Sequence, residues 1–62
     1  MSGSEIIERA GVSNASFSDA VEKAINDVKD GRAVHWFQVI DQRGRIKPDG
    51  QIEFQVILRI GV

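Results

Sequence analysis

Apolar residues recur with a helical period between Ser16 and Gly31. The apolar positions are Phe17, Ala20, Val21, Ala24, Ile25 and Val28, with polar residues between them. This spacing gives a helix one buried stripe and one solvated face. Ser16 is a suitable N-cap, Asp19 follows at the capping-box spacing, and Gly31 supplies a C-terminal stop. The pattern therefore predicts one amphipathic helix with a defined beginning and end.

Strict alternation of apolar and polar residues marks residues 51–60. One face of a strand here would carry Ile52, Phe54, Val56, Leu58 and Ile60, and the other Gln51, Glu53, Gln55, Ile57 and Arg59. Residues 33–46 are also rich in β-forming residues, and Pro48 and Gly50 fit a type I turn between the two stretches. Residues 4–10 can form another strand. The sequence thus predicts an α+β chain ordered strand, helix, strand, strand, ending in an antiparallel hairpin.

The register of this hairpin decides which of two adjacent aromatic residues faces the helix. If a four-residue turn follows Ile46, then Phe37 and Val39 lie on the all-apolar face, which must take the helix. Trp36 then points to the opposite face and leaves the core of the monomer. A bulge near Gly44 would shift the register by one residue and reverse this arrangement.

The face that carries Trp36 is too apolar to be comfortable in water. Its other members in this register are Gln38, Ile40, Gln55, Ile57 and Arg59. Such a surface indicates either a subunit interface or a stacking platform for a planar ligand, and both hold if the site lies between subunits. A chain of 62 residues without cysteine has no disulfide to compensate for its small core, so oligomerisation is expected.

Composition and charge exclude several classes of function. The net charge of −1 with interspersed signs argues against a nucleic-acid binder. No apolar run is long enough for a membrane span, and the first residues lack the pattern of a secretion signal, so a cytoplasmic protein is expected. No arrangement of nucleophile, base and acid can be argued from the sequence. We therefore expect a binding protein rather than an enzyme.

Several short motifs, taken in order, resemble the dodecins, a family of small flavin-binding proteins. They are "GVS" at residues 11–13, "SFSDAVEKAI" at the helix start, "WFQVIDQRGRI" and "DGQIEFQVILRIGV". Each motif is weak alone, but together they extend from about Ile6 to Val62. The resemblance implies a β-α-β-β chain, residues 1–62, whose three-stranded antiparallel sheet wraps around one helix. It also implies assembly as a hollow homododecamer.

The resemblance implies a function in storing, buffering and quenching free flavin, either FMN or riboflavin. It places an isoalloxazine ring on Trp36 at a subunit interface, and some members of the family also bind coenzyme A. The alternative is a non-catalytic oligomerisation module whose Trp36 face makes only protein contacts.

Four residues are the candidates for flavin contact. Trp36 offers the stacking surface, and the resemblance assigns the pyrimidine edge of the flavin to Gln55 and the phosphate of FMN to Arg43. Gln38 lies two residues beyond Trp36 on the same face and could flank the ligand. In the predicted register Gln55 opposes Gln42, about 20 Å along the strand from Trp36. One flavin could not touch both residues of one chain, so the site should combine residues from different subunits.

Overall fold

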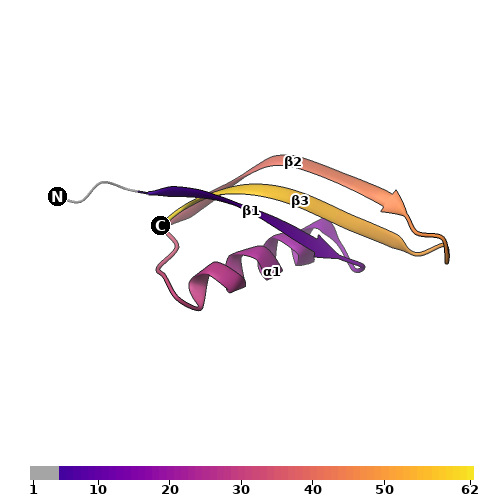
Figure 1. The fold of residues 1–62 in the computed structure, drawn as a ribbon, viewed down its shortest axis with the longest axis horizontal. Coiled ribbons are helices and arrows are strands. Elements are labelled where there is room, and N and C mark those ends of the chain that lie inside the picture. Colours follow the sequence, from indigo (N-terminus) through magenta and orange to yellow (C-terminus); the bar gives the residue numbers. More distant parts are fainter. Residues whose placement is uncertain (1–4) are drawn as a thin grey trace.

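The computed structural model describes residues 5–62, which form three strands and one helix. The elements are β1 (Ile6–Ser13), α1 (Phe17–Lys29), β2 (Trp36–Ile46) and β3 (Ile52–Gly61). The strands pair antiparallel in the order β1-β3-β2, with α1 on one side of the sheet (Figure 1). The predicted β-α-β-β order and the predicted antiparallel sheet are both confirmed.

The core lies between α1 and the central strand β3. Its buried members are Ala20, Ala24, Val28, Val56, Leu58 and Ile60. Gly11 lets α1 approach β1 closely, because a Cβ at this position would overlap the carbonyl oxygen of Ala20 and lie 3.1 Å from the Cβ of Ala24. Beyond them, Phe17 and Phe54 stack edge to face with their ring centroids 4.9 Å apart. The predicted stripe of α1 therefore packs on the sheet as its period requires.

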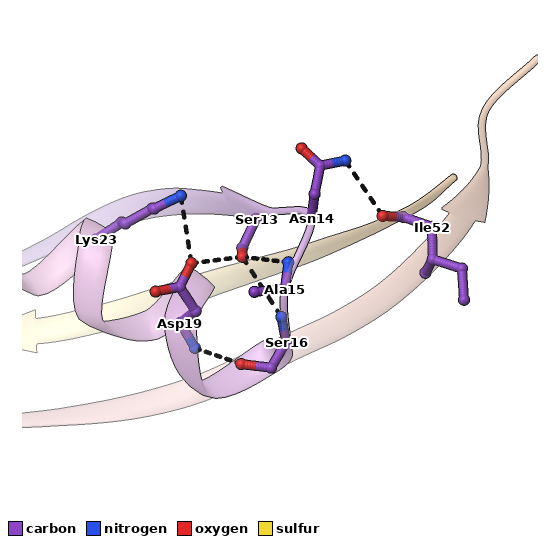
Figure 2. A network of polar contacts seen from close by, with 7 residues as sticks. All are labelled: Ser13, Asn14, Ala15, Ser16, Asp19, Lys23 and Ile52. Carbon is purple, nitrogen blue, oxygen red and sulfur yellow. Dashed lines mark hydrogen bonds and ion pairs between the residues drawn. The ribbon is translucent and has the colours of Figure 1, made fainter. Parts of the chain in front are cut away.

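The start of α1 is held by three side chains rather than by a reciprocal capping box (Figure 2). The N–H of Asp19 donates to Oγ of Ser16 at 2.9 Å, so Ser16 is the predicted N-cap. The Asp19 carboxylate, however, accepts a hydrogen bond from the buried Oγ of Ser13 at 2.6 Å and pairs with Lys23 at 3.2 Å. The Ser13 hydroxyl in turn accepts from the N–H of Ala15 at 2.8 Å. β1 and α1 are thus joined at their junction by partly buried polar contacts.

The helix ends just before Gly31, as predicted, but this glycine does not form a left-handed cap. The helix ends at Lys29, and the cap residue Asp30 keeps right-handed helical angles. The N–H groups of Gly31 and Arg32 both donate to the carbonyl of Val28, at 3.1 and 3.0 Å. Among the described glycines only the one at position 50, in the hairpin turn, has a positive φ. Gly31 therefore follows a tightened last turn rather than forming a left-handed cap.

The turn of the β2–β3 hairpin has the predicted chemistry. The N–H of Gly50 donates to the carbonyl of Lys47 at 2.8 Å, which closes a turn with Pro48 at its second position. Gly50 has a φ of 88°, a left-handed value that favours glycine. Figure 1 shows this hairpin reaching past the ends of β1 and α1.

The predicted register holds for only half of the hairpin. At the start of β2, Trp36 pairs with Gly61 as expected, and the next residues follow in step up to Val39. A bulge at Ile40, between Val39 and Asp41, then adds one residue to β2. Beyond it Arg43 pairs with Gln55, so the expected pairing of Gln42 with Gln55 is wrong.

Phe37 and Val39 are the second correction. Both lie on the side of the sheet that carries α1, but Phe37 is 49% exposed and Val39 is 38% exposed. The helix packs on β1 and β3 and leaves the edge strand β2 uncovered (Figure 1). These two residues are therefore not part of a helix-covered core in the isolated chain. Trp36 is 42% exposed, so both adjacent aromatic residues are partly open to solvent in the isolated chain.

Candidate functional site

Trp36 lies with its indole against the backbone of Gly61. A Cβ built on Gly61 would overlap Nε1, Cε2 and Cδ1, three atoms of the same five-membered ring, so the ring presents its face to the glycine. Gly61 is buried beneath it, and the two residues are direct cross-strand partners. An aromatic ring that covers a strand glycine in this way is a recognised means of fixing both. One indole face is thus occupied within the chain, while the residue as a whole stays 42% exposed.

Gln38 follows Trp36 on the outer face of the sheet, the face away from α1. Its cross-strand partner is Arg59, whose guanidinium lies 3.8 Å from the carboxylate of Glu8 on β1. The indole is therefore bordered by polar and charged side chains that can reach a ligand lying on it. The structure keeps Trp36 and Gln38 on one face, as the alternation predicted.

A second group of predicted residues meets further along the same face. Arg43 and Gln55 are cross-strand partners, and with Asp41 and Ile57 they line a cavity of about 250 Å³. The bulge at Ile40 makes this possible, because it turns Asp41 and Arg43 to the outer face. Sequence reasoning missed Asp41, since an unbulged strand would have given it the other face.

Arg43 does not stand as a free cation. Its Nη2 and Nε both donate to Oδ2 of Asp41, at 2.6 and 3.2 Å. Both side chains are well exposed, so the pair contributes little to folding stability. Its effect is instead to hold the guanidinium beside the cavity, where the remaining N–H groups can meet an anion.

Gln55 is held in place by Glu53, a residue that sequence reasoning also missed. Gln55 Nε2 donates to Oε1 of Glu53 at 2.8 Å, and Arg45 Nε donates to the same oxygen at 2.8 Å. These two hydrogen bonds, with the charges of Arg45 and Lys47, hold the pKa of Glu53 below its usual range. The sequence could have indicated this contact, because Glu53 and Gln55 are two residues apart on one strand and therefore share a face.

The two halves of the candidate site are far apart within one chain. Gly61, under the indole, and Gln55 are separated by six positions along β3, which corresponds to roughly 20 Å. A single flavin ring cannot reach both Trp36 and Gln55 of the same chain. A ligand that uses both must lie between two copies.

His35, directly before Trp36 in the sequence, makes a structural backbone contact. The backbone N–H of His35 donates to the carbonyl of Gly61 at 2.9 Å, which pins the start of β2. Within residues 5–62 no three histidine, cysteine or acidic side chains gather in a way that could hold a metal ion. In the same residues no helix is long and apolar enough to cross a membrane.

A family model and several solved structures match the sequence and fold of this chain. The family profile described as Dodecin matches residues 4–62. Dodecin from Streptomyces coelicolor is 33% identical, with a TM-score of 0.85 over 95% of this chain and 86% of the other. A single-residue variant of Thermus thermophilus dodecin is 30% identical, with a TM-score of 0.85 over 95% and 88% of the two chains.

One structural neighbour carries a different ligand in its name. The Mycobacterium tuberculosis protein described as a calcium dodecin has a TM-score of 0.90 over 98% of this chain and 89% of the other. Its sequence is 22% identical, so it supports the fold alone. No curated protein matched the sequence significantly. Since the family profile spans nearly the whole chain, the chain belongs to the dodecins, a family of small non-catalytic binding proteins.

Proposed function

We propose that this chain binds a flavin, FMN or riboflavin, and stores, buffers and quenches it. The observation that carries the proposal is the indole of Trp36, fixed on Gly61 and partly open on the outer face of the sheet. An isoalloxazine ring is large, flat and electron-poor, which suits stacking on an electron-rich indole. Flavin binding is typical of the family, which supports the same ligand.

The polar residues of the outer face fit the rest of a flavin. Gln55 has a free carboxamide oxygen and a second N–H, which match the carbonyl and N–H of a pyrimidine edge. Arg43, which lines the 250 Å³ cavity, is suited to the phosphate of FMN. Gln38, beside Trp36, would flank the bound ring. No step of chemistry is needed from these groups, because they bind and orient the ligand.

The ligand would lie between subunits of a homo-oligomer. The family implies self-association, and the roughly 20 Å between the two halves of the site requires a second copy. The uncovered apolar residues of β2, Phe37 and Val39, are consistent with further burial on assembly. We propose the hollow dodecamer that the resemblance to the dodecins implies. Coenzyme A stays a prediction of the resemblance alone.

Close contact between indole and isoalloxazine supports quenching as well as storage. A stacked tryptophan can donate an electron to the excited flavin, so the bound flavin should lose its fluorescence. Stacking should contribute about 1–3 kcal/mol per ring, by analogy with nucleic-acid bases on aromatic side chains.

A fluorescence titration, combined with a mass measurement of the assembly, tests the proposal. Riboflavin and FMN should be quenched by the intact oligomer, and Trp36→Ala should abolish quenching while the assembly persists. If neither flavin is quenched, and Trp36→Ala instead dissociates the oligomer, the Trp36 face makes only protein contacts. The alternative role as an oligomerisation module would then replace flavin binding.

A further inference from the structure

Glu53 is the centre of the hydrogen bonds around Gln55. Its Oε1 accepts from Gln55 Nε2 and from Arg45 Nε, each at 2.8 Å, and its side chain is only 18% exposed. Glu53 and Gln55 are two residues apart on β3, and Arg45 is the cross-strand partner of Glu53. One carboxylate oxygen therefore ties a neighbour on its own strand to a neighbour on β2.

This contact limits what Gln55 can offer to a ligand. A carboxamide carries one carbonyl oxygen and two N–H donors, and a half-turn about its last bond exchanges the oxygen with the nitrogen. An ionised carboxylate only accepts, so Glu53 favours the nitrogen of Gln55 on its side. The reversed carboxamide would bring two oxygens together. What remains for a ligand is the carbonyl oxygen and one N–H, in a defined order.

We infer that Glu53 is the positioning residue of the flavin site, because it sets the order of acceptor and donor that Gln55 presents. The inference rests on the proposed function. The imide edge of a flavin has an N–H beside a carbonyl. The Gln55 oxygen would accept from that N–H, and the remaining Gln55 N–H would donate to the carbonyl. Glu53 acts through Gln55 and does not itself touch the ligand.

The groups around Glu53 favour its ionised form. The hydrogen bonds from Gln55 and Arg45 lower its pKa against the opposing effect of desolvation, and the charges of Arg45 and Lys47 lower it further. On β2, Arg43 and Asp41 are the next charged residues along the outer face. β1 adds no charge opposite, since its last paired residue faces position 54 of β3. Glu53 therefore stays ionised at neutral pH and loses its charge only well into the acid range.

The test compares two ligands that differ only at the imide nitrogen. This nitrogen carries a hydrogen in riboflavin and a methyl group in 3-methylriboflavin, so the second ligand has no imide donor. Binding to the intact oligomer is measured by flavin fluorescence for the wild type, Gln55→Ala, Glu53→Ala and Glu53→Gln. Glu53→Ala should weaken riboflavin about tenfold, the size of one charge-assisted hydrogen bond. It should change 3-methylriboflavin much less, as should Gln55→Ala.

The conservative variant separates positioning from packing. In Glu53→Gln the new amide oxygen can accept the same two hydrogen bonds, so riboflavin binding at neutral pH should stay within a few-fold of the wild type. A mass measurement of each variant identifies any loss of assembly.

Two results would overturn the inference and leave the proposed function standing. One is a Glu53→Ala oligomer that binds riboflavin like the wild type although Gln55→Ala does not. The other is an equal loss for both ligands, which would indicate a general disturbance of the sheet. If the wild-type oligomer binds no flavin at all, the proposed function fails, and the role of Glu53 fails with it.

Discussion

The indole of Trp36 rests face-on against Gly61, its cross-strand partner, and any side chain at position 61 would collide with the ring. The backbone of Gly61 therefore supports the face of the indole that is turned toward the sheet. Its missing side chain is what lets the indole lie flat on the sheet.

Gly61→Ala should displace the indole and weaken flavin binding at least tenfold, through loss of the stacking geometry. The matched control is Gly44→Ala, in the partner strand, where an added Cβ would make an ordinary contact of 3.5 Å with the carbonyl oxygen of Glu53. Flavin fluorescence titration of both variants checks this. Equal affinities for the two would contradict the role of Gly61.

Sites shared between subunits should be recoverable by mixing two defective chains. Oligomers of Trp36→Ala alone or Gln55→Ala alone should bind flavin poorly. Mixed oligomers, refolded together, should regain part of the quenching, because some interfaces then pair an intact Trp36 with an intact Gln55. Quenching is measured against mixtures prepared without refolding. No recovery in mixed oligomers would mean that both residues serve the ligand from the same chain.

Arg43 should distinguish FMN from riboflavin. Arg43→Ala should lower the affinity for FMN about tenfold more than that for riboflavin, because one charge-assisted contact to the phosphate is lost. The variant also leaves Asp41 without its ion-pair partner. The double variant with Asp41→Asn removes that added repulsion and should recover part of the FMN affinity. An identical loss for both flavins would argue against a phosphate contact.

Gly11→Ala should destabilise the fold, because its methyl group would overlap the carbonyl of Ala20, which backbone movement alone can relieve. Overpacking of this kind typically costs about 1–3 kcal/mol. Chemical denaturation measures the loss, and Gly31→Ala, where an added Cβ meets nothing within 4 Å, is the control. A Gly11→Ala protein as stable as the control would show that α1 shifts freely.

Asp19 should make the fold more stable at neutral than at acid pH. The hydrogen bond from Ser13, then that from Lys23, lowers the pKa of Asp19 (Figure 2). A lowered pKa contributes stability that is present above the unfolded-state value near 4 and is lost as the pH falls through the folded-state value. The thermal stability of Asp19→Asn should therefore lie below that of the wild type at pH 7, and the difference should close below about pH 4.

The control for this pH profile is Asp27→Asn, which alters an exposed acid of the same helix. It removes a carboxylate from the same helix and leaves the contacts of Asp19 in place. If the gap between wild type and Asp19→Asn persists at low pH, the carboxylate charge is not what stabilises the helix start.

The features predicted from the sequence are the ones that local spacing determines. The stripe of α1, its Ser16 cap and the Pro48–Gly50 turn all depend on neighbours within one or two turns of chain. The bulge could not be predicted, because nothing marks Ile40 in the sequence. Gly44, the suspected position, pairs regularly with Phe54.

The exposure of Phe37 depends on contacts between distant residues. Periodicity gives the face on which a residue lies, but the close approach of α1 to Gly11 decides which strands the helix covers. The alternation of apolar and polar residues was enough to place Trp36 and Gln55 on the outer face. The pairing of Arg43 with Gln55 could not be predicted, because it depends on the register that the bulge at Ile40 sets.

The bulge at Ile40 has a consequence for how β2 can carry a binding surface. Trp36 and Arg43 are seven positions apart, an odd number, so in a regular strand one of them would face the helix side. The single extra residue corrects this parity and brings both to the outer face. Removing Ile40 would keep every other side chain of β2, yet it would divide the surface between the two sides of the sheet.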